Sequence, residues 1–436
     1  MKPDDFSLDF ILPLPSRQFM ALLGEIMLLL RWAHDETLGI IPPYFRALGC
    51  RMFRSSPYGW TSQYLFGFFF SYGVYLPFWG LWFAHLGVNA SNIGLLIGMG
   101  LAVRCVANLV LTPRIHKVEH LIPALRWLAL AALLSCVIYI FCGGSLWALA
   151  AVTVLFNLAA GPVIPLSDAL ANHYAKDGHL DYGRTRLWGS IAFIGGSTLV
   201  GLLAAQYGAN VIPWVAIAGL AAALVFSMRN PTIAPSAHEE SGQSRPALSE
   251  MLRDSLVIRL LVIAALLQGS HAAYYSFSAI YWKEIGYSEA IIGYLWSFSV
   301  LAEIFVFATS KRLFVNWSVA GMFRLAAFGV LLRWGMTASM TALPMLVIAQ
   351  ALHGVTFAAA HLAAIRYIQQ APSNQMVALQ ALYNALPLGA FMALMTALSG
   401  WLYGLWGANL FWLMAVMAVP VLFIPVEKKT TAHAVS

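Results

Sequence analysis

The ten residues LGVNASNIGL at positions 86–95 return later in the chain as IGYSEAIIGY at positions 285–294. In both stretches an aliphatic residue and a glycine are followed, at the same spacing, by Ile-Gly, and the copies are offset by 199 residues. The same offset carries Arg104 onto Glu303. A repeat at this distance predicts two related halves of similar length, each with one copy of the stretch.

The composition places both halves in a membrane. Of the 436 residues, 60% are hydrophobic and 10% are charged, whereas an average soluble domain has about 25% charged residues. A water-soluble fold has no means of hiding so much apolar surface, so we predict an integral membrane protein in contact with the lipid bilayer. The net charge of +7 comes from basic residues in short loops, so no nucleic-acid site is predicted.

Twelve runs of the chain reach the roughly 20 apolar residues that a membrane-crossing helix needs. We therefore predict an all-α fold of twelve transmembrane helices in two six-helix, pseudo-symmetric bundles. The predicted bundles are 60–228 and 257–427, with a linker at 229–256 and a tail at 428–436. The predicted helices are 60–86, 91–112, 121–142, 145–172, 184–206 and 210–228, then 257–283, 288–310, 319–339, 342–369, 376–404 and 407–426.

The basic residues of the loops alternate between the two sides of the membrane. Loops after even-numbered helices carry Arg114, Lys117, Lys176, Arg184, Arg229, Arg245, Arg253, Lys311, Arg312, Arg366, Lys428 and Lys429. On the other side the basic residue is Lys283, with Glu284 and Glu289 beside it. The excess of positive charge predicts that both termini and the linker are cytoplasmic, in a bacterial inner membrane.

Residues 1–59 match no part of the twelve-helix core. The apolar stretch at 16–33 is interrupted by Glu25, and Asp4 stands where a signal peptide carries positive charge. Two interpretations remain, an interfacial amphipathic helix or a start codon assigned too far upstream with Met52 opening the protein, and we favour the second.

The sequence indicates no metal site, no cofactor and no catalytic site. The four cysteines have no Cys-x-x-Cys spacing and no clustered histidines, and no ATP-binding Gly-x-x-x-x-Gly-Lys run occurs. The four cysteines are Cys50, Cys105, Cys136 and Cys142. The acids predicted at membrane depth, Asp168 and Glu303, lie in different halves without a nucleophile beside them, so we predict a protein that is not an enzyme.

Charges at membrane depth are expected to face a partner or a wet cavity, because each costs at least about 2.5–3.5 kcal/mol at the bilayer centre. Two prolines kink the fourth helix just before Asp168, which then lines a cavity, closes a gate, or snorkels to the surface. Arg186 follows one turn into the fifth helix and suits a carboxylate, from Asp168 or from an anionic substrate. The alternative for Arg186 is an anchor at the membrane interface.

Glu303 in the eighth helix has no charged neighbour in the sequence. Burial disfavours the charged form of a carboxyl group, so Glu303 is a candidate to hold a proton in one state and release it in another. Arg333, His353 and Arg104 are its candidate counter-groups. The alternative is a static pair of Glu303 with an arginine that holds two helices together.

Two stripes at helical spacing are candidate linings of a substrate site. An aromatic stripe on the first helix consists of Tyr72, Tyr75, Trp79 and Trp82, and a polar stripe on the seventh consists of Gln268, His271, Tyr275 and Ser278. Aromatic residues at this spacing also serve packing between helices, so both readings stay open for the aromatic stripe.

From about Met52 to its end, the chain resembles the phenylpropionate permease family of the major facilitator superfamily. The motifs that carry this resemblance are Ser71–Gly73, Leu76–Trp79, Pro165–Asn172, Arg186–Ser190, Gln268–Tyr275, Gly293–Ser297, Ala302-Glu303 and His361–Tyr367. The resemblance implies a secondary active transporter that imports an aromatic monocarboxylate such as 3-phenylpropionate, together with a proton, by alternating access.

A more distant resemblance is to the lactose permease family of proton–sugar symporters. Its acid and arginine in helices 4 and 5 correspond to Asp168 and Arg186, and its arginine and histidine in helices 9 and 10 correspond to Arg333 and His353. The coupling glutamate of that family is replaced by Thr356, which leaves Glu303 as the candidate acid. A loop signature common in the superfamily is degraded here at 111–117.

We therefore expect a substrate site of Asp168, Arg186, Arg104, Tyr72, Tyr75, Trp79, His271 and Tyr275, and proton coupling through Glu303, Arg333 and His353. The expected partners are a small aromatic acid and a proton, without a cofactor, and a monomer is expected. The alternatives are a proton symporter for a sugar or nucleoside, and a membrane nutrient sensor that does not transport.

Overall fold

The computed structural model describes residues 54–115, 117–235 and 248–426, which are helical apart from two short strands. The strands are β1 (Arg54–Ser55) and β2 (Asn230–Pro231), and the carbonyl of Ser55 accepts a 2.8 Å hydrogen bond from the backbone N–H of Thr232. The predicted start at Met52, the central part of the predicted linker at 236–247 and the predicted tail at 428–436 lie outside the described residues.

The helices of the first half begin directly after β1. They are α3 (Pro57–His85), α4 (Ala90–Val110), α5 (Leu121–Ile140), α6 (Leu146–Ala160), α7 (Val163–Lys176), α8 (Tyr182–Tyr207) and α9 (Ile212–Ser227). Short 3-10 turns are η2 (Thr112–Arg114), η3 (Val118–His120) and η4 (Ala209–Val211). The predicted fourth helix is divided into α6 and α7 because the Gly161-Pro162 pair interrupts the backbone hydrogen bonding there.

The second half follows a short helix, α10 (Leu248–Met251). Its helices are α11 (Ser255–Gly269), α12 (Ala272–Glu284), α13 (Glu289–Leu313), α14 (Val319–Ser339), α15 (Leu343–Ala351), α16 (Ala360–Gln369), α17 (Ser373–Ala385), α18 (Met392–Trp406) and α19 (Leu410–Val416). Two π-helical turns, η5 (Gly354–Ala359) and η6 (Leu386–Phe391), and two 3-10 turns, η7 (Gly407–Asn409) and η8 (Pro420–Leu422), complete it.

Within the described residues, eleven helical segments are long and apolar enough to cross a membrane, against twelve predicted. The last segment, Asn374–Leu422, has 49 residues, about twice the roughly 20 that one crossing needs. It contains the ranges predicted as helices 11 and 12, and Gly407 divides it with a φ of +54° that favours glycine. The predicted twelfth helix, 407–426, is shorter than expected because α19 ends at Val416, before Pro420.

The repeat recognised in the sequence is present in the structure as two equivalent turns. After α3, Gly87 has a φ of +81°, and the next N–H, of Val88, donates to the carbonyl of Phe83. After α12, Gly286 has a φ of +99°, and the N–H of Tyr287 donates to the equivalent carbonyl, that of Trp282. Such helix ends need a glycine in the left-handed region. This explains why Gly87 and its copy Gly286 occur at the same place in each half.

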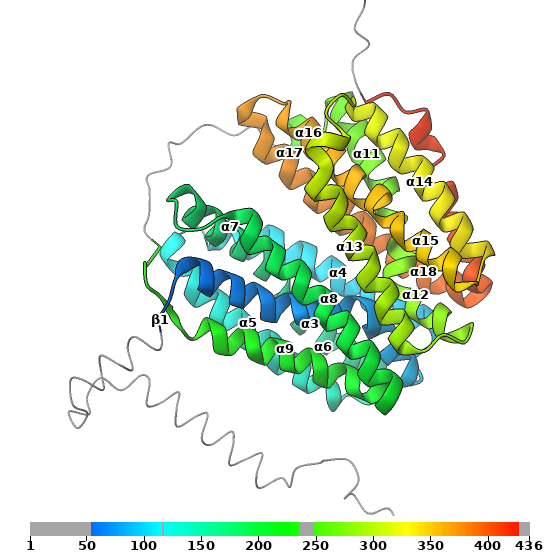
Figure 1. Cartoon of the computed structure of the whole chain (residues 1–436), viewed down its shortest axis with the longest axis horizontal. Helices are drawn as coiled ribbons and strands as arrows, with labels where there is room; N and C mark the ends of the chain where they lie inside the picture. The colour runs from blue at the N-terminus through cyan, green and yellow to red at the C-terminus, as the bar shows by residue number, and fades with distance from the viewer. Residues whose placement is uncertain (1–53, 116, 236–247, 427–436) are drawn as a thin grey trace, which may run out of the picture. The chain divides into compact units, whose positions relative to one another are not determined.

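The two halves meet at the end of the bundle that carries these turns, which we call the turn end. There α4 packs on α18 and α8 on α13, as Figure 1 shows for the latter pair. A Cβ added to Gly94 would lie 2.5 Å from the Cα of Gly400, and one added to Gly293 would lie 2.5 Å from the carbonyl oxygen of Ser197. The backbones therefore touch without side chains between them.

At the opposite end, which carries the linker and which we call the linker end, helices pack within their own halves. α7 packs against α3, α5, α6 and α8, whereas α16 packs against α11, α14 and α17. The structure thus has its halves joined from the turn end to the level of Cys105. Ser197 and Ser297 are hydrogen-bonded across the halves at 2.8 Å, and Sγ of Cys105 donates to the carbonyl of Ala385 across them at 3.4 Å.

Substitution of Gly94 by alanine is expected to weaken the closed turn end, because the added Cβ has no space and overpacking costs about 1–3 kcal/mol. The measurement is oxidative cross-linking of Ser197→Cys with Ser297→Cys in a chain without its native cysteines. We expect Gly94→Ala to lower the yield about fivefold or more, whereas Gly195→Ala, whose nearest neighbour would be 3.9 Å away, leaves it unchanged. Equal yields in both variants would contradict tight closure at Gly94.

Candidate functional site

A cavity of about 320 Å³ lies between the two halves and is lined by side chains from both. Its polar lining consists of Arg104, Arg186, Ser190, Ser299, Glu303 and His353. Its aromatic lining consists of Phe69, Tyr72, Tyr75, Trp79, Phe193, Tyr275, Trp296 and Phe357. Two guanidinium groups, a carboxyl group and many rings thus share one cavity at membrane depth.

The structure brings most of the predicted site residues together. Eight of them line the cavity, namely Tyr72, Tyr75, Trp79, Arg104, Arg186, Tyr275, Glu303 and His353. Three others, Asp168, His271 and Arg333, lie behind the lining, and each contacts the lining or a residue that supports it. Trp82 of the aromatic stripe is buried against Trp79 instead of lining the cavity.

Arg104 comes from the middle of α4 and lies against the break between α6 and α7. Its Nη2 donates to the side-chain carbonyl of Asn157 at 3.2 Å, and its guanidinium carbon lies 5.2 Å from the ring centre of Tyr72. A Cβ at Gly161 would lie 3.0 Å from Cγ of Arg104, so glycine at the break gives the arginine its room. Among the described residues, no carboxylate lies within 4 Å of Arg104, which leaves its charge available to the cavity.

Arg186 comes from the first turns of α8 and already has an acidic neighbour. Its Nε lies 3.7 Å from Oδ1 of Asp168 on α7, and its guanidinium carbon lies 4.3 Å from the ring centre of Phe69. Both charged side chains are partly exposed, at 34% and 28%. The predicted pair of Asp168 and Arg186 is therefore present. An acid of the same half thus compensates part of the positive charge of Arg186.

The aromatic side chains of α3 form one wall with the help of a neighbouring helix. The ring centres of Tyr75 and Trp79 are 5.0 Å apart, and Phe156 of α6 lies 5.0 Å from Tyr75. Tyr72 meets Phe193 of α8 edge to face at 6.1 Å. These separations lie in the range of favourable ring contacts, so the wall is both packing and lining.

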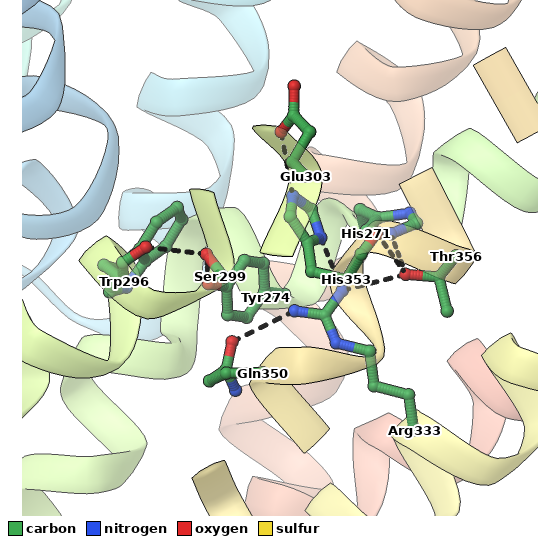
Figure 2. A network of polar contacts seen from close by, with 9 residues as sticks. All are labelled: His271, Tyr274, Trp296, Ser299, Glu303, Arg333, Gln350, His353 and Thr356. Carbon is green, nitrogen blue, oxygen red and sulfur yellow. Dashed lines mark hydrogen bonds and ion pairs between the residues drawn. The ribbon is translucent and has the colours of Figure 1, made fainter. Parts of the chain in front are cut away.

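Glu303, His353 and Arg333 form a chain of contacts within the second half (Figure 2). Oε2 of Glu303 lies 3.6 Å from Nε2 of His353, and Nδ1 of His353 lies 2.8 Å from Nη1 of Arg333. Glu303 faces the cavity with 25% of its side chain exposed, whereas Arg333 is fully buried. Glu303 lies in α13 and Arg333 in α14, and His353 directly precedes η5.

The contact with Arg333 decides which nitrogen of His353 carries a proton. An arginine side chain has only donors, so Nδ1 of His353 must accept and is unprotonated. The neutral ring then carries its proton on Nε2, the nitrogen that faces Glu303. The charge of Arg333 therefore acts on Glu303 through an uncharged imidazole.

Among the described residues, no carboxylate lies within 4 Å of the Arg333 side chain. Nη1 also donates to Oγ1 of Thr356 at 3.1 Å, and Nη2 donates to Oε1 of Gln350 at 3.1 Å. Its guanidinium carbon lies 4.2 Å from the ring centre of Trp334. Thr356 is in turn 3.1 Å from Nε2 of His271, so His271 supports the network from behind instead of facing the cavity.

A local change of helix geometry places His353 beside Glu303. The π-helical turn η5 begins at Gly354, directly after His353, and such turns are frequent at functional sites. A Cβ at Gly354 would lie 2.7 Å from the carbonyl oxygen of Ala302, the residue before Glu303. The glycine thus lets the two helices approach until the side chains meet.

Some residues of the site were missed in the sequence. Asn157, Gln350, Trp296, Ser299 and Phe69 each line the cavity or hold a charged group in place. Asn157 and Gln350 offered a signal, because an amide inside an apolar helix needs a partner. The aromatic and serine residues offered none, since their spacing alone is equally typical of helix packing.

Comparisons with known proteins agree on the type of protein. The model of the MFS_1 like family matches residues 58–414. A protein of Escherichia coli (strain K12) described as "Probable 3-phenylpropionic acid transporter" is 42% identical over 367 residues, which cover 84% of this chain and 96% of that protein. The "Maltose permease" of Geobacillus stearothermophilus is 25% identical over 381 residues, covering 85% and 94%.

Solved structures share the fold at low identity. The nucleoside transporter NupG has a TM-score of 0.72 at 15% identity, covering 85% of this chain and 98% of that chain. The POT family transporter PepTSo has a TM-score of 0.63 at 11% identity, covering 84% of this chain and 96% of that chain. The family match, the relatives and the shared fold together show that this chain belongs to the MFS_1-like family and is a membrane transporter with the two-bundle fold of the major facilitator type.

Proposed function

We propose that this transporter imports an aromatic monocarboxylate such as 3-phenylpropionate together with a proton. The observation that carries the proposal is the cavity in which Arg104, without a carboxylate partner among the described residues, lies over Tyr72 and among further rings. A carboxylate and a phenyl ring are the groups that such a lining binds. The description of the Escherichia coli relative with 42% identity, "Probable 3-phenylpropionic acid transporter", gives independent support for this substrate class.

Arg104 is the better anchor for the substrate carboxylate. Arg186 shares its charge with Asp168 at 3.7 Å, whereas the described hydrogen bond of the Arg104 side chain goes to the neutral amide of Asn157. A guanidinium without an acid gains more from a substrate anion, because no existing pair has to be broken. In this proposal Asp168 and Arg186 act as a second pair at the edge of the site.

The phenyl ring of the substrate lies against the aromatic wall of α3. Tyr72, Tyr75 and Trp79 offer faces and edges at the cavity, and Tyr275 and Trp296 lie on the wall of the other half. Side chains of both halves then contact the flat ring of the substrate. Substrate binding therefore favours the approach of the two halves. His271 contributes indirectly, through its contact with Thr356.

Glu303 is the proposed proton carrier, with His353 and Arg333 as the groups that set its environment. A substrate carboxylate and a charged Glu303 in the same cavity, at roughly 8 Å, repel each other by about 2 kcal/mol at an effective dielectric constant of 20. Substrate binding therefore favours the protonated form of Glu303. This repulsion couples the proton to the substrate without a direct contact between them.

The side of the membrane toward which the cavity opens is proposed from the topology together with the closed turn end. If the linker end is cytoplasmic, as the basic loops predict, then the structure is closed toward the outside. The cavity then represents a state that releases substrate to the cytoplasm. We propose a bacterial inner-membrane location with cytoplasmic termini on the same basis.

Uptake of labelled 3-phenylpropionate into cells that express the full chain tests the function. We expect accumulation that a protonophore abolishes, because the proton gradient drives it. Competition with unlabelled maltose and with a nucleoside separates the alternative substrates. Uptake that is absent although the protein is in the membrane would refute the aromatic acid as substrate, and inhibition of uptake by maltose or the nucleoside would refute selectivity for aromatic acids.

Arg104→Gln is expected to raise the KM for 3-phenylpropionate about 10- to 150-fold, because the lost charge-assisted hydrogen bonds contribute about 1.5–3 kcal/mol. Arg186→Gln is the matched control, since it removes the same charge from the same cavity beside Asp168. We expect the smaller effect from this control. A larger rise in KM for Arg186→Gln would assign the anchor to Arg186 instead.

Glu303→Gln is expected to separate exchange from accumulation. The neutral side chain mimics the protonated form, so substrate counterflow between loaded vesicles and medium should persist, while accumulation driven by a proton gradient is lost. Asp254→Asn serves as the control, because it removes a carboxylate outside the cavity and keeps the helix cap on Leu256. Gradient-driven accumulation that persists in Glu303→Gln would show that another group carries the proton.

A further inference from the structure

A second hollow lies away from the substrate cavity, between the start of α11 and the end of the described chain. Its volume is about 500 Å³, and its walls include Ile258 and Val262 of α11 together with Pro420 and Phe423 after α19. The one charged side chain among its lining residues is Arg259. Nothing in the proposed transport cycle uses this hollow.

The hollow opens on the surface that faces the lipid. Ile258, Val262 and Phe423 are 44%, 41% and 78% exposed, and in a membrane-spanning helix such apolar side chains contact acyl chains. The span that contains α11 begins at Ser255, so Arg259 lies one turn inside the helix start. A side chain at that depth reaches the level of the lipid headgroups.

The residues that the structure describes use little of the hydrogen-bonding capacity of Arg259. Its described contact is a hydrogen bond of 3.4 Å from Nη1 to the carbonyl oxygen of Pro425. Among the residues that the structure describes, no carboxylate lies within 4 Å of this guanidinium. An arginine has five N–H donors in a fixed planar arrangement that matches the oxygens of a phosphate.

We propose that this hollow binds an anionic phospholipid, with its phosphate on Arg259 and an acyl chain against Ile258, Val262 and Phe423. The charge of the lining favours such a lipid, because Arg259 is its one charged residue and gives the hollow a net positive charge. Each basic residue near a membrane surface attracts anionic lipid by a similar small amount. A zwitterionic lipid has the same phosphate, but its own cation offsets part of this attraction.

Native mass spectrometry of the purified full chain tests the site, with phosphatidylglycerol and phosphatidylcholine of identical acyl chains added in turn. The wild-type protein should retain phosphatidylglycerol in preference to phosphatidylcholine. Arg259→Gln should lower the retained phosphatidylglycerol about fivefold, the effect of one basic residue near the surface. The matched control is Arg312→Gln, which removes an exposed arginine near the end of α13 and should leave retention unchanged.

A second variant tests the acyl-chain part of the site without altering charge. Val262→Trp fills the hollow and should lower retention of phosphatidylglycerol while thermal unfolding shows that the protein remains folded. Unchanged retention in Arg259→Gln would overturn the proposal. An equal loss of phosphatidylglycerol and phosphatidylcholine in Arg259→Gln would also overturn the proposal, because Arg259 would then not distinguish the two headgroups.

Discussion

The free-energy cost of burying charged groups away from water determines where the polar residues of this transporter lie. Arg333 is fully buried, and among the described residues its two terminal nitrogens contact a threonine, a glutamine and an imidazole nitrogen, whereas its Nε has no hydrogen-bond partner there. Removing one acceptor from such a group leaves a buried donor unpaired, which costs about 1–3 kcal/mol. The helices that carry these acceptors are therefore held in one arrangement, and that arrangement places His353 toward Glu303.

The same constraint distributes charge between the two halves. The first half contributes Arg104 and the pair of Arg186 with Asp168, whereas the second half contributes Glu303 with its supporting network. The copies of the internal repeat place Arg104 and Glu303 at equivalent positions. An approximately symmetric fold thus presents a cation on one wall of the cavity and a carboxyl group on the other, the arrangement on which the proposed coupling of an anion to a proton rests.

Much of the fold was predictable because the bilayer restricts the possibilities to apolar helices of known length. The repeat, the break at Gly161-Pro162 and the ranges of most helices followed from residues alone. The break between α11 and α12 did not, because no proline marks it and Ser270 and His271 are stabilised there by contacts with Trp334 and Thr356. The π-helical turns were equally invisible, since they depend on which helix packs alongside.

The chain of Glu303, His353 and Arg333 lies entirely within the second half, on α13, directly before η5, and on α14. If each half moves as a unit, these contacts are the same whichever side of the membrane the cavity faces. In the function proposed above, the proton-binding group then belongs to one half, whereas the aromatic substrate contacts side chains of both halves. Substitutions among the lining residues of the first half would then alter the choice of substrate and leave the surroundings of Glu303 within its own half unchanged.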